Sequence, residues 1–273
     1  VAKVSFYTNA SFLIAGSLLY RDMRTMSELG SGAAARTVLF AKGATEQQAM
    51  AFLQPIVIET HPIGNPWLSY NIYLSNSLIP GMLMLFIFMI TVYSIGTEIK
   101  YRTAKTWLNM AGGNILKALS AKLLPHTIAF FVMGALYVFY LYGYLAFPCH
   151  CGIPTMLLLT LLMVIAAQGM GVLMIGTLPT LRLGLSFASL WGVISFSIAG
   201  ISFPVMAMHP MLQGVCLLFP LRHYFILYVN CALNGYPLLD AWPYLGGLLC
   251  FALLPVVMAK RMKNVLLYAK YVP

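Results

Sequence analysis

The side chains best suited to reactive chemistry stand in one short run, where Cys149, His150 and Cys151 follow one another. Thiolate and imidazole groups suit soft metal ions such as copper. Methionine, however, is an ordinary gap-filling residue in apolar helices, and a run of three residues fixes no coordination geometry. We therefore predict no metal site. The other soft ligands expected on the same side of the molecule are Met206, Met208, His209 and Met211.

No familiar catalytic motif occurs in the sequence. It has no G-x-x-x-x-G-K-[ST] phosphate loop, and the glycine pair at Gly112 and Gly113 is followed by Asn114. It also has no H-E-x-x-H metal motif, no G-x-S-x-G nucleophile elbow and no pair of carboxylates placed for acid–base work. We predict no catalytic residue and no cofactor, ATP included, on this chain.

The composition indicates the class of protein in which these residues are placed. Hydrophobic residues make up 61% of the 273 residues, charged residues 8%, and the mean hydropathy is +0.86. A soluble domain carries about a quarter charged residues. Five stretches without Asp, Glu, Lys or Arg are each long enough to cross about 30 Å of hydrocarbon as a helix. The sequence therefore predicts an all-α integral membrane protein with five transmembrane helices, over 78–97, 123–148, 153–181, 183–208 and 242–259.

The basic residues predict how these spans are oriented. Cytoplasmic loops retain Lys and Arg, and ten basic residues fall on one side of the five-span arrangement. Their position at the ends of apolar runs also argues against nucleic-acid binding, despite the net charge of +10. We predict a cytoplasmic C-terminus and an inner-membrane location. The ten residues are Lys100, Arg102, Lys105, Lys117, Lys122, Arg182, Lys260, Arg261, Lys263 and Lys270.

The N-terminal region, residues 1–77, mixes charges of both signs and contains no long apolar run. We expect a small, mixed α/β region outside the cytoplasm, with helix and turn over 25–54 and loop or strand over 55–73. An external N-terminal region needs its own anchor, so we expect a further span upstream of Val1. Residues 78–273 form the second predicted domain, the transmembrane permease domain.

Prolines interrupt the apolar segment 209–241, between the last two spans. Each half is too short to cross, so we predict a re-entrant or interfacial helix pair at the outer surface. The cationic pair within it can seal an outer gate or meet an anionic head group, and snorkelling to the interface explains it equally well. The predicted outer gate consists of Phe203, Pro204, Pro210, Pro220, Arg222 and His223.

The cytoplasmic segment 97–120 has an apolar flank and a charged flank when drawn as a helix. Glu98 and Arg102 are spaced for an i,i+4 ion pair, and Trp107 and Leu108 lead the apolar flank. This pattern is typical either of a solvated connection or of a helix that docks on a soluble partner.

Two sets of residues resemble the type-two ABC exporter permeases, over nearly the whole chain. The family often has glycine where this chain has Arg102, and often proline where it has Ala111, Gly112 and Gly113. The first matching set is Glu98, Arg102, Thr103, Leu108, Lys122, Leu123 and Pro125. The second is Gly200, Ile201, Ser202, Phe203, Pro204, Met208, Pro210, Phe219, Pro220, Leu221, Arg222, His223, Tyr224, Asn234 and Gly235.

The resemblance implies the partners and the site. Such a chain supplies half of a translocation pathway in a homodimer or heterodimer, and separate ATPase subunits bind ATP and magnesium. Some relatives also work with a periplasmic adaptor and an outer-membrane channel. The implied contact with the ATPase is made by Glu98, Arg102, Thr103, Trp107 and Leu108.

Two other functions fit the composition. One is a secondary transporter or channel, and the other is a membrane scaffold without transport. A proton-driven transporter would be expected to hold ionisable residues at mid-membrane, and the predicted spans lack Asp, Glu, Lys and Arg. The sequence therefore favours the ATP-driven exporter.

Overall fold

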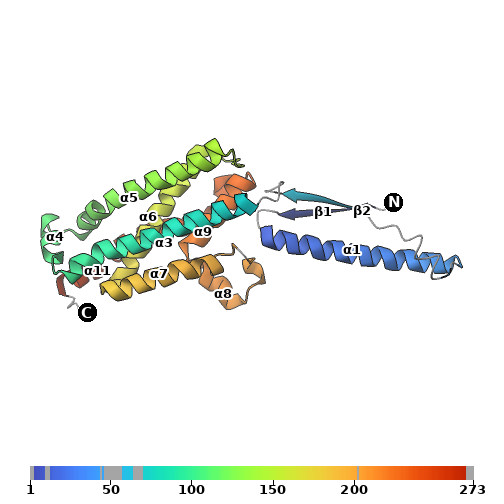
Figure 1. Ribbon diagram of the computed structural model, residues 1–273. Helices are drawn as coiled ribbons and strands as arrows, with labels where there is room; N and C mark the ends of the chain where they lie inside the picture. The colour runs from blue at the N-terminus through green and yellow to red at the C-terminus, as the bar shows by residue number, and fades with distance from the viewer. Residues whose placement is uncertain are drawn as a thin grey trace. The chain divides into compact units, whose positions relative to one another are not determined.

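The computed structural model describes residues 3–9, 13–43, 45, 57–63, 70–201 and 203–268 (Figure 1). The chain divides into two compact units, Val1–Tyr73 and Leu74–Pro273. The division falls four residues before the start of the predicted permease domain at residue 78.

The first unit contains a strand β1 (Lys3–Asn9), a long helix α1 (Leu13–Ala41) and a strand β2 (Val57–Ile63). The two strands pair in parallel, with Lys3 opposite Val57. A parallel pair needs a crossover between its strands, and α1 lies in that connection. The helix begins earlier than the predicted 25–54, and the second half of that range lies largely outside the described residues. The position of this unit outside the cytoplasm stays a prediction.

The second unit confirms the prediction of five helices long and apolar enough to cross a membrane. Each overlaps one of the uncharged stretches, although the ends differ. The fourth helix ends at Ile198 rather than near residue 208, because Gly200 adopts a φ of +83° and stops the helix. The five candidate spans are α3 (Tyr70–Lys100), α5 (Ile115–Val138) with the π-helical turn Phe139–Tyr144, α6 (Ile153–Thr177), α7 (Leu181–Ile198), and α10 (Trp242–Val257) with the turn Leu238–Ala241 before it.

The predicted interrupted segment forms two helical pieces bent by 91° at one break. The first is α8 (Pro210–Val215) with the turn Cys216–Leu218, and the second is α9 (Pro220–Tyr228) with the π-helical turn Val229–Leu233. Pro220 stands at the first position of α9, where its missing N–H leaves no hydrogen bond unmade. The helix pair is therefore present, and its sequence accounts for the break.

Helix α6 forms the core of this unit and packs against α5, α7, α9 and α10. Small residues allow the close approach, as in other membrane helix pairs. A Cβ atom added to Gly169 would collide with the backbone carbonyl of Phe251 in α10. The buried Gln168 links α6 to α5, since its Nε2 donates to the Leu123 carbonyl at 3.2 Å and its Oε1 accepts from Thr127 at 2.8 Å.

Candidate functional site

The predicted amphipathic helix over 97–120 is wrong as one continuous element. Helix α3 ends at Lys100, a short helix α4 (Ala104–Met110) follows, and α5 begins at Ile115. Arg102 interrupts the helix and makes the first junction. Its φ is +60°, a left-handed conformation that glycine adopts without steric cost. Gly112 and Gly113 make the second junction, with φ values of +65° and +73°.

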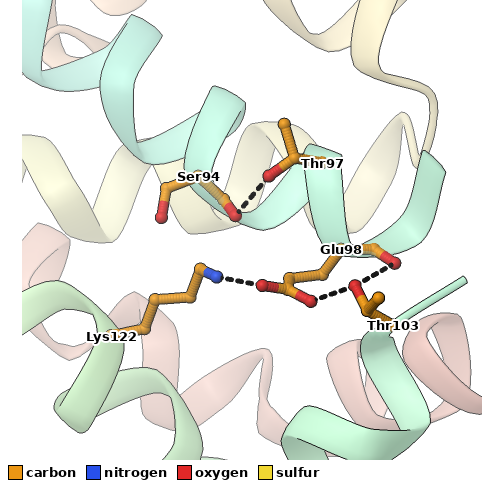
Figure 2. Close-up of polar contacts among 5 residues, drawn as sticks. All are labelled: Ser94, Thr97, Glu98, Thr103 and Lys122. Atoms are coloured by element: carbon orange, nitrogen blue, oxygen red, sulfur yellow. Dashed lines mark hydrogen bonds and ion pairs between the residues drawn. The ribbon is translucent and has the colours of Figure 1, made fainter. Parts of the chain in front are cut away.

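The predicted ion pair between Glu98 and Arg102 is also wrong. The i,i+4 spacing requires a continuous helix, and the chain leaves the helix before Arg102. Figure 2 shows the actual partners of Glu98: one carboxylate oxygen accepts from the Lys122 ammonium of α5, and the other accepts from the Thr103 hydroxyl. The Glu98 backbone carbonyl also accepts from the Thr103 N–H at 3.0 Å. Glu98 therefore joins the end of α3 to both α5 and the start of α4.

Lys122 adds a contact with α4 itself. Its Nζ lies 5.0 Å from the centroid of the half-buried Trp107 ring, within the range of a cation–π interaction. The side chains of Glu98 and Lys122 are each 20% exposed, so the pair is screened less than a surface ion pair. We call Glu98, Thr103, Trp107 and Lys122 the latch. Sequence reasoning placed the first three in the contact with the ATPase, whereas it used Lys122 only for the orientation and the family match.

The apolar flank of α4 faces the protein's own core rather than solvent. Leu108 is 2% exposed and Ala104 is buried. Tyr101 and Met110, by contrast, are 68% and 82% exposed, and Lys105 is exposed between them. The surface that α4 offers to a partner is therefore its outer side, and Leu108 does not belong to it.

A C-terminal helix α11 (Ala259–Tyr268) packs against α4, α5 and α6, and sequence reasoning missed it. Figure 1 shows α11 and α4 at the same end of the second unit. Arg261 Nε donates to the Gly176 carbonyl at the end of α6, at 2.9 Å. The signal was present in the sequence, because the buried Met262 and Leu266 are four residues apart among basic residues. Helix α11 therefore connects the α4 region to the central helix α6.

The residues of the predicted outer gate differ in their burial. Phe203 and Pro210 are exposed, Pro204 is half-buried, and Pro220 and His223 are buried. Arg222 Nη1 donates to the Ala199 carbonyl at the end of α7, at 3.0 Å. This set therefore contains both surface residues and packing residues, and its role as an outer gate stays a prediction.

Arg222 and His223 hold the bent pair against two spans. The Arg222 guanidinium occupies the space that a Cβ on Gly200 would fill. His223 Nε2 lies 2.9 Å from the Leu217 carbonyl, and the imidazole packs at the edge of the Phe251 ring, with centroids 5.7 Å apart. A Cβ on Gly247 of α10 would collide with this imidazole. Both side chains thus fix α9 to its neighbours, α7 and α10.

The cysteine run lies in the connection between α5 and α6. Its described contacts do not involve the other soft ligands. His209 acts locally, because its Nδ1 accepts from the Met211 N–H at 3.3 Å. Met206 is 94% exposed. The described part of the chain contains no group of three or more His, Cys, Asp or Glu side chains placed to hold a metal ion.

Comparison with known families gives one result that covers most of the chain. The model of the ABC-2 family transporter proteins matches residues 1–260. Comparison with curated proteins returns no match for this chain. The family match includes the first compact unit, all five candidate spans, and the second unit up to residue 260. The chain therefore belongs to the ABC-2 transporter family and is a membrane permease of an ABC transporter.

Proposed function

We propose that this permease is the membrane subunit of an ATP-driven exporter, coupled to separate ATPase subunits through α4. The single observation that carries the proposal is the position of α4. The latch holds it at the junction of α3 and α5, while Tyr101, Lys105 and Met110 face outward. A short helix held in this way can receive a displacement from a soluble partner and pass it to two spans. The ATPase partner would bind the ATP and magnesium.

The transmission route follows contiguous contacts. A movement of α4 acts on α3 through Thr103 and Glu98, and on α5 through Lys122. It also acts on α6 through α11, which contacts both α4 and α6. Since α6 packs against α5, α7, α9 and α10, a shift at its end reaches most of the unit. Packed helices joined by hydrogen bonds are the physical means by which such coupling travels.

The orientation and assembly extend the proposal. Basic residues gather at the α4 and α11 end, so this end faces the cytoplasm, and the N-terminal unit lies outside the inner membrane. The bent pair α8 and α9 is then a re-entrant pair at the outer surface. A second permease copy or a homologue completes the pathway, and a periplasmic adaptor and an outer-membrane channel are candidate further partners.

Reconstitution into vesicles tests the energy source. Transport should require ATP and the co-purified ATPase, and should continue when the proton gradient is collapsed. Transport driven by an imposed pH step without any ATPase would instead establish a secondary transporter. A scaffold would give no transport and no change in ATP hydrolysis. Compounds that stimulate the hydrolysis identify candidate substrates.

A further inference from the structure

The two cysteines between α5 and α6 are close enough to react with each other. The Sγ atoms of Cys149 and Cys151 lie 4.0 Å apart, and both cysteines are free and partly exposed. A disulfide has an S–S distance of about 2.05 Å. A displacement of about 2 Å, within reach of side-chain rotation in a turn, would therefore bring the two sulfur atoms to bonding distance.

The backbone around the pair is fixed by contacts. The His150 N–H donates to the Ala232 carbonyl, in the π-helical turn after α9, at 3.0 Å. Gly152 turns the chain into α6 with a φ of +78°, and the Thr155 hydroxyl donates to the Cys151 carbonyl at 2.8 Å. A Cβ added to Gly235 would lie 3.2 Å from the Cβ of His150, so the run also packs closely against the loop after α9. The two thiols are therefore held near each other.

The surroundings give the two thiols different acidities. The hydrogen bond between the two thiols, in which either sulfur can be the donor, lowers the pKa of Cys149 to about 7 together with the N–H groups of Gly152 and Cys151, although burial opposes this. The same hydrogen bond, together with burial, raises the pKa of Cys151. The thiolate is the nucleophilic form of cysteine, so Cys149 is the attacking residue of the pair. The other titratable groups that face these thiols are those of Tyr142, Tyr224, Tyr228 and Cys231.

We propose that Cys149 and Cys151 form a thiol–disulfide exchange site whose substrate is a low-molecular-weight disulfide. The Cys149 thiolate attacks one sulfur of the disulfide, forms a mixed disulfide and expels the other half as a thiolate. That thiolate takes the proton of Cys151. The Cys151 sulfur then attacks Cys149, releases the second half and closes the internal disulfide. The pair loses two electrons and two protons, and the small disulfide is reduced to two thiols. One proton passes from Cys151 to the first thiolate released, and the proton that Cys149 gives to solvent on ionising balances the one that the second thiolate takes from solvent.

This site is independent of the proposed export function, because it rests on the contacts of one connection. In its oxidised state the bond would constrain the chain between α5 and α6, opposite the loop after α9. The described contacts of Cys216 and Cys250 do not involve this pair, since Cys216 donates to the Gln213 carbonyl and Cys250 is exposed on α10. Cys250 is therefore a suitable control.

The test uses the purified full chain with oxidised glutathione, followed by mass spectrometry of the peptide that contains both cysteines. The wild-type peptide should lose two hydrogens, and Cys151→Ala should trap glutathione at Cys149. Cys149→Ala should carry little glutathione, and Cys250→Ala should form the bridge as the wild type does. The wild-type rate should rise as pH increases through about 7, because the thiolate fraction of Cys149 rises.

Two results would overturn the proposal. One is a wild-type peptide that forms no bridge. The other is equal glutathione uptake by the two variants, at Cys151 in Cys149→Ala and at Cys149 in Cys151→Ala. That result would show that Cys149 is not the preferred attacking residue. If an alanine variant fails to fold, iodoacetamide labelling of the wild type decides the order. Cys149 should be modified before Cys151 at neutral pH, and the reverse order would contradict the assignment.

Discussion

Lys263 donates a hydrogen bond to the Gly113 carbonyl oxygen, at 3.0 Å, and so connects α11 to the turn that follows α4. The two residues are 150 positions apart in the sequence. Gly113 follows Gly112, and both residues adopt a positive φ in the turn between α4 and α5. The C-terminal helix therefore contacts the turn that sets the direction between α4 and α5.

Replacing Lys263 should weaken coupling more than stability. The side chain is exposed, so Lys263→Ala should cost about 1 kcal/mol or less of unfolding free energy. ATP hydrolysis stimulated by substrate should nevertheless fall, because α11 would no longer restrain the turn after α4. Lys260→Ala is the matched control, since Lys260 is exposed on the same helix and its side chain makes no hydrogen bond within the described residues. Equal coupling in both variants would argue against a role for this contact.

The partner of Glu98 can be tested by a double-mutant cycle. Removing one member leaves the other charge partly buried, so Glu98→Gln and Lys122→Met should each lower the unfolding free energy by about 1–2 kcal/mol. The double variant should lose less than the sum of the two. Arg102→Ala should leave the stability nearly unchanged, because Arg102 is exposed. Coupling between Glu98 and Arg102 instead of Lys122 would contradict the observed pairing.

The spans could be predicted because their signal is the absence of charge over a length that the bilayer sets. The first junction inside 97–120 could not be predicted. Arg102 is an ordinary helix-forming residue by propensity, and nothing local announces its left-handed conformation. Once the helix breaks there, the i,i+4 spacing from Glu98 has no geometric meaning, and Lys122 takes the carboxylate from 24 positions away.

Two residues of the predicted outer gate show a second limit of prediction from the sequence. Arg222 and His223 stand out in the sequence as charged or titratable groups near the end of a span, a pattern that favours a gate. Their observed contacts include the Ala199 carbonyl and Gly200 just after α7, the Leu217 carbonyl, and Gly247 of α10. Such pairings between distant segments leave no periodic pattern in the sequence.

The predicted orientation can be checked by cysteine accessibility in a variant that lacks the native cysteines. Lys42→Cys should be labelled by a membrane-impermeant reagent added outside the cell. Lys260→Cys should be labelled only after the membrane is opened, because basic residues are retained in the cytoplasm. Both positions are exposed within their own units, so failure to label would not reflect burial there. Labelling of both from one side would contradict the five-span orientation.

The close contact between α6 and α10 gives a prediction about packing. Gly169→Ala places a methyl group against the Phe251 carbonyl, and backbone must move to accept it. Overpacking of this kind costs about 1–3 kcal/mol, so the thermal unfolding temperature in detergent should fall. Gly246→Ala is the control, because a Cβ there meets no atom within 4 Å. Equal unfolding temperatures for the two variants would show that α6 and α10 are not packed this closely.

The surface of α4 separates residues that hold the helix from residues that contact the ATPase. Leu108→Ala should lower the stability of the chain by about 2–5 kcal/mol, because the side chain is 2% exposed in the protein's own core. Met110→Ala should leave the stability within about 0.5 kcal/mol, since the side chain is 82% exposed. If Met110 lies in the contact, its loss should weaken binding of the ATPase.

Trp107 should show both effects, because its ring contacts Lys122 and is still half-exposed. Large aromatic side chains often anchor interfaces, so Trp107→Ala should weaken ATPase binding by about 2 kcal/mol or more. Co-purification of the ATPase and substrate-stimulated hydrolysis measure binding and coupling, and thermal unfolding of the isolated chain measures stability. Trp107→Phe keeps an aromatic face for Lys122 and should recover most of the stability. Wild-type ATPase binding in both Trp107→Ala and Met110→Ala would show that the outer side of α4 does not contact the ATPase.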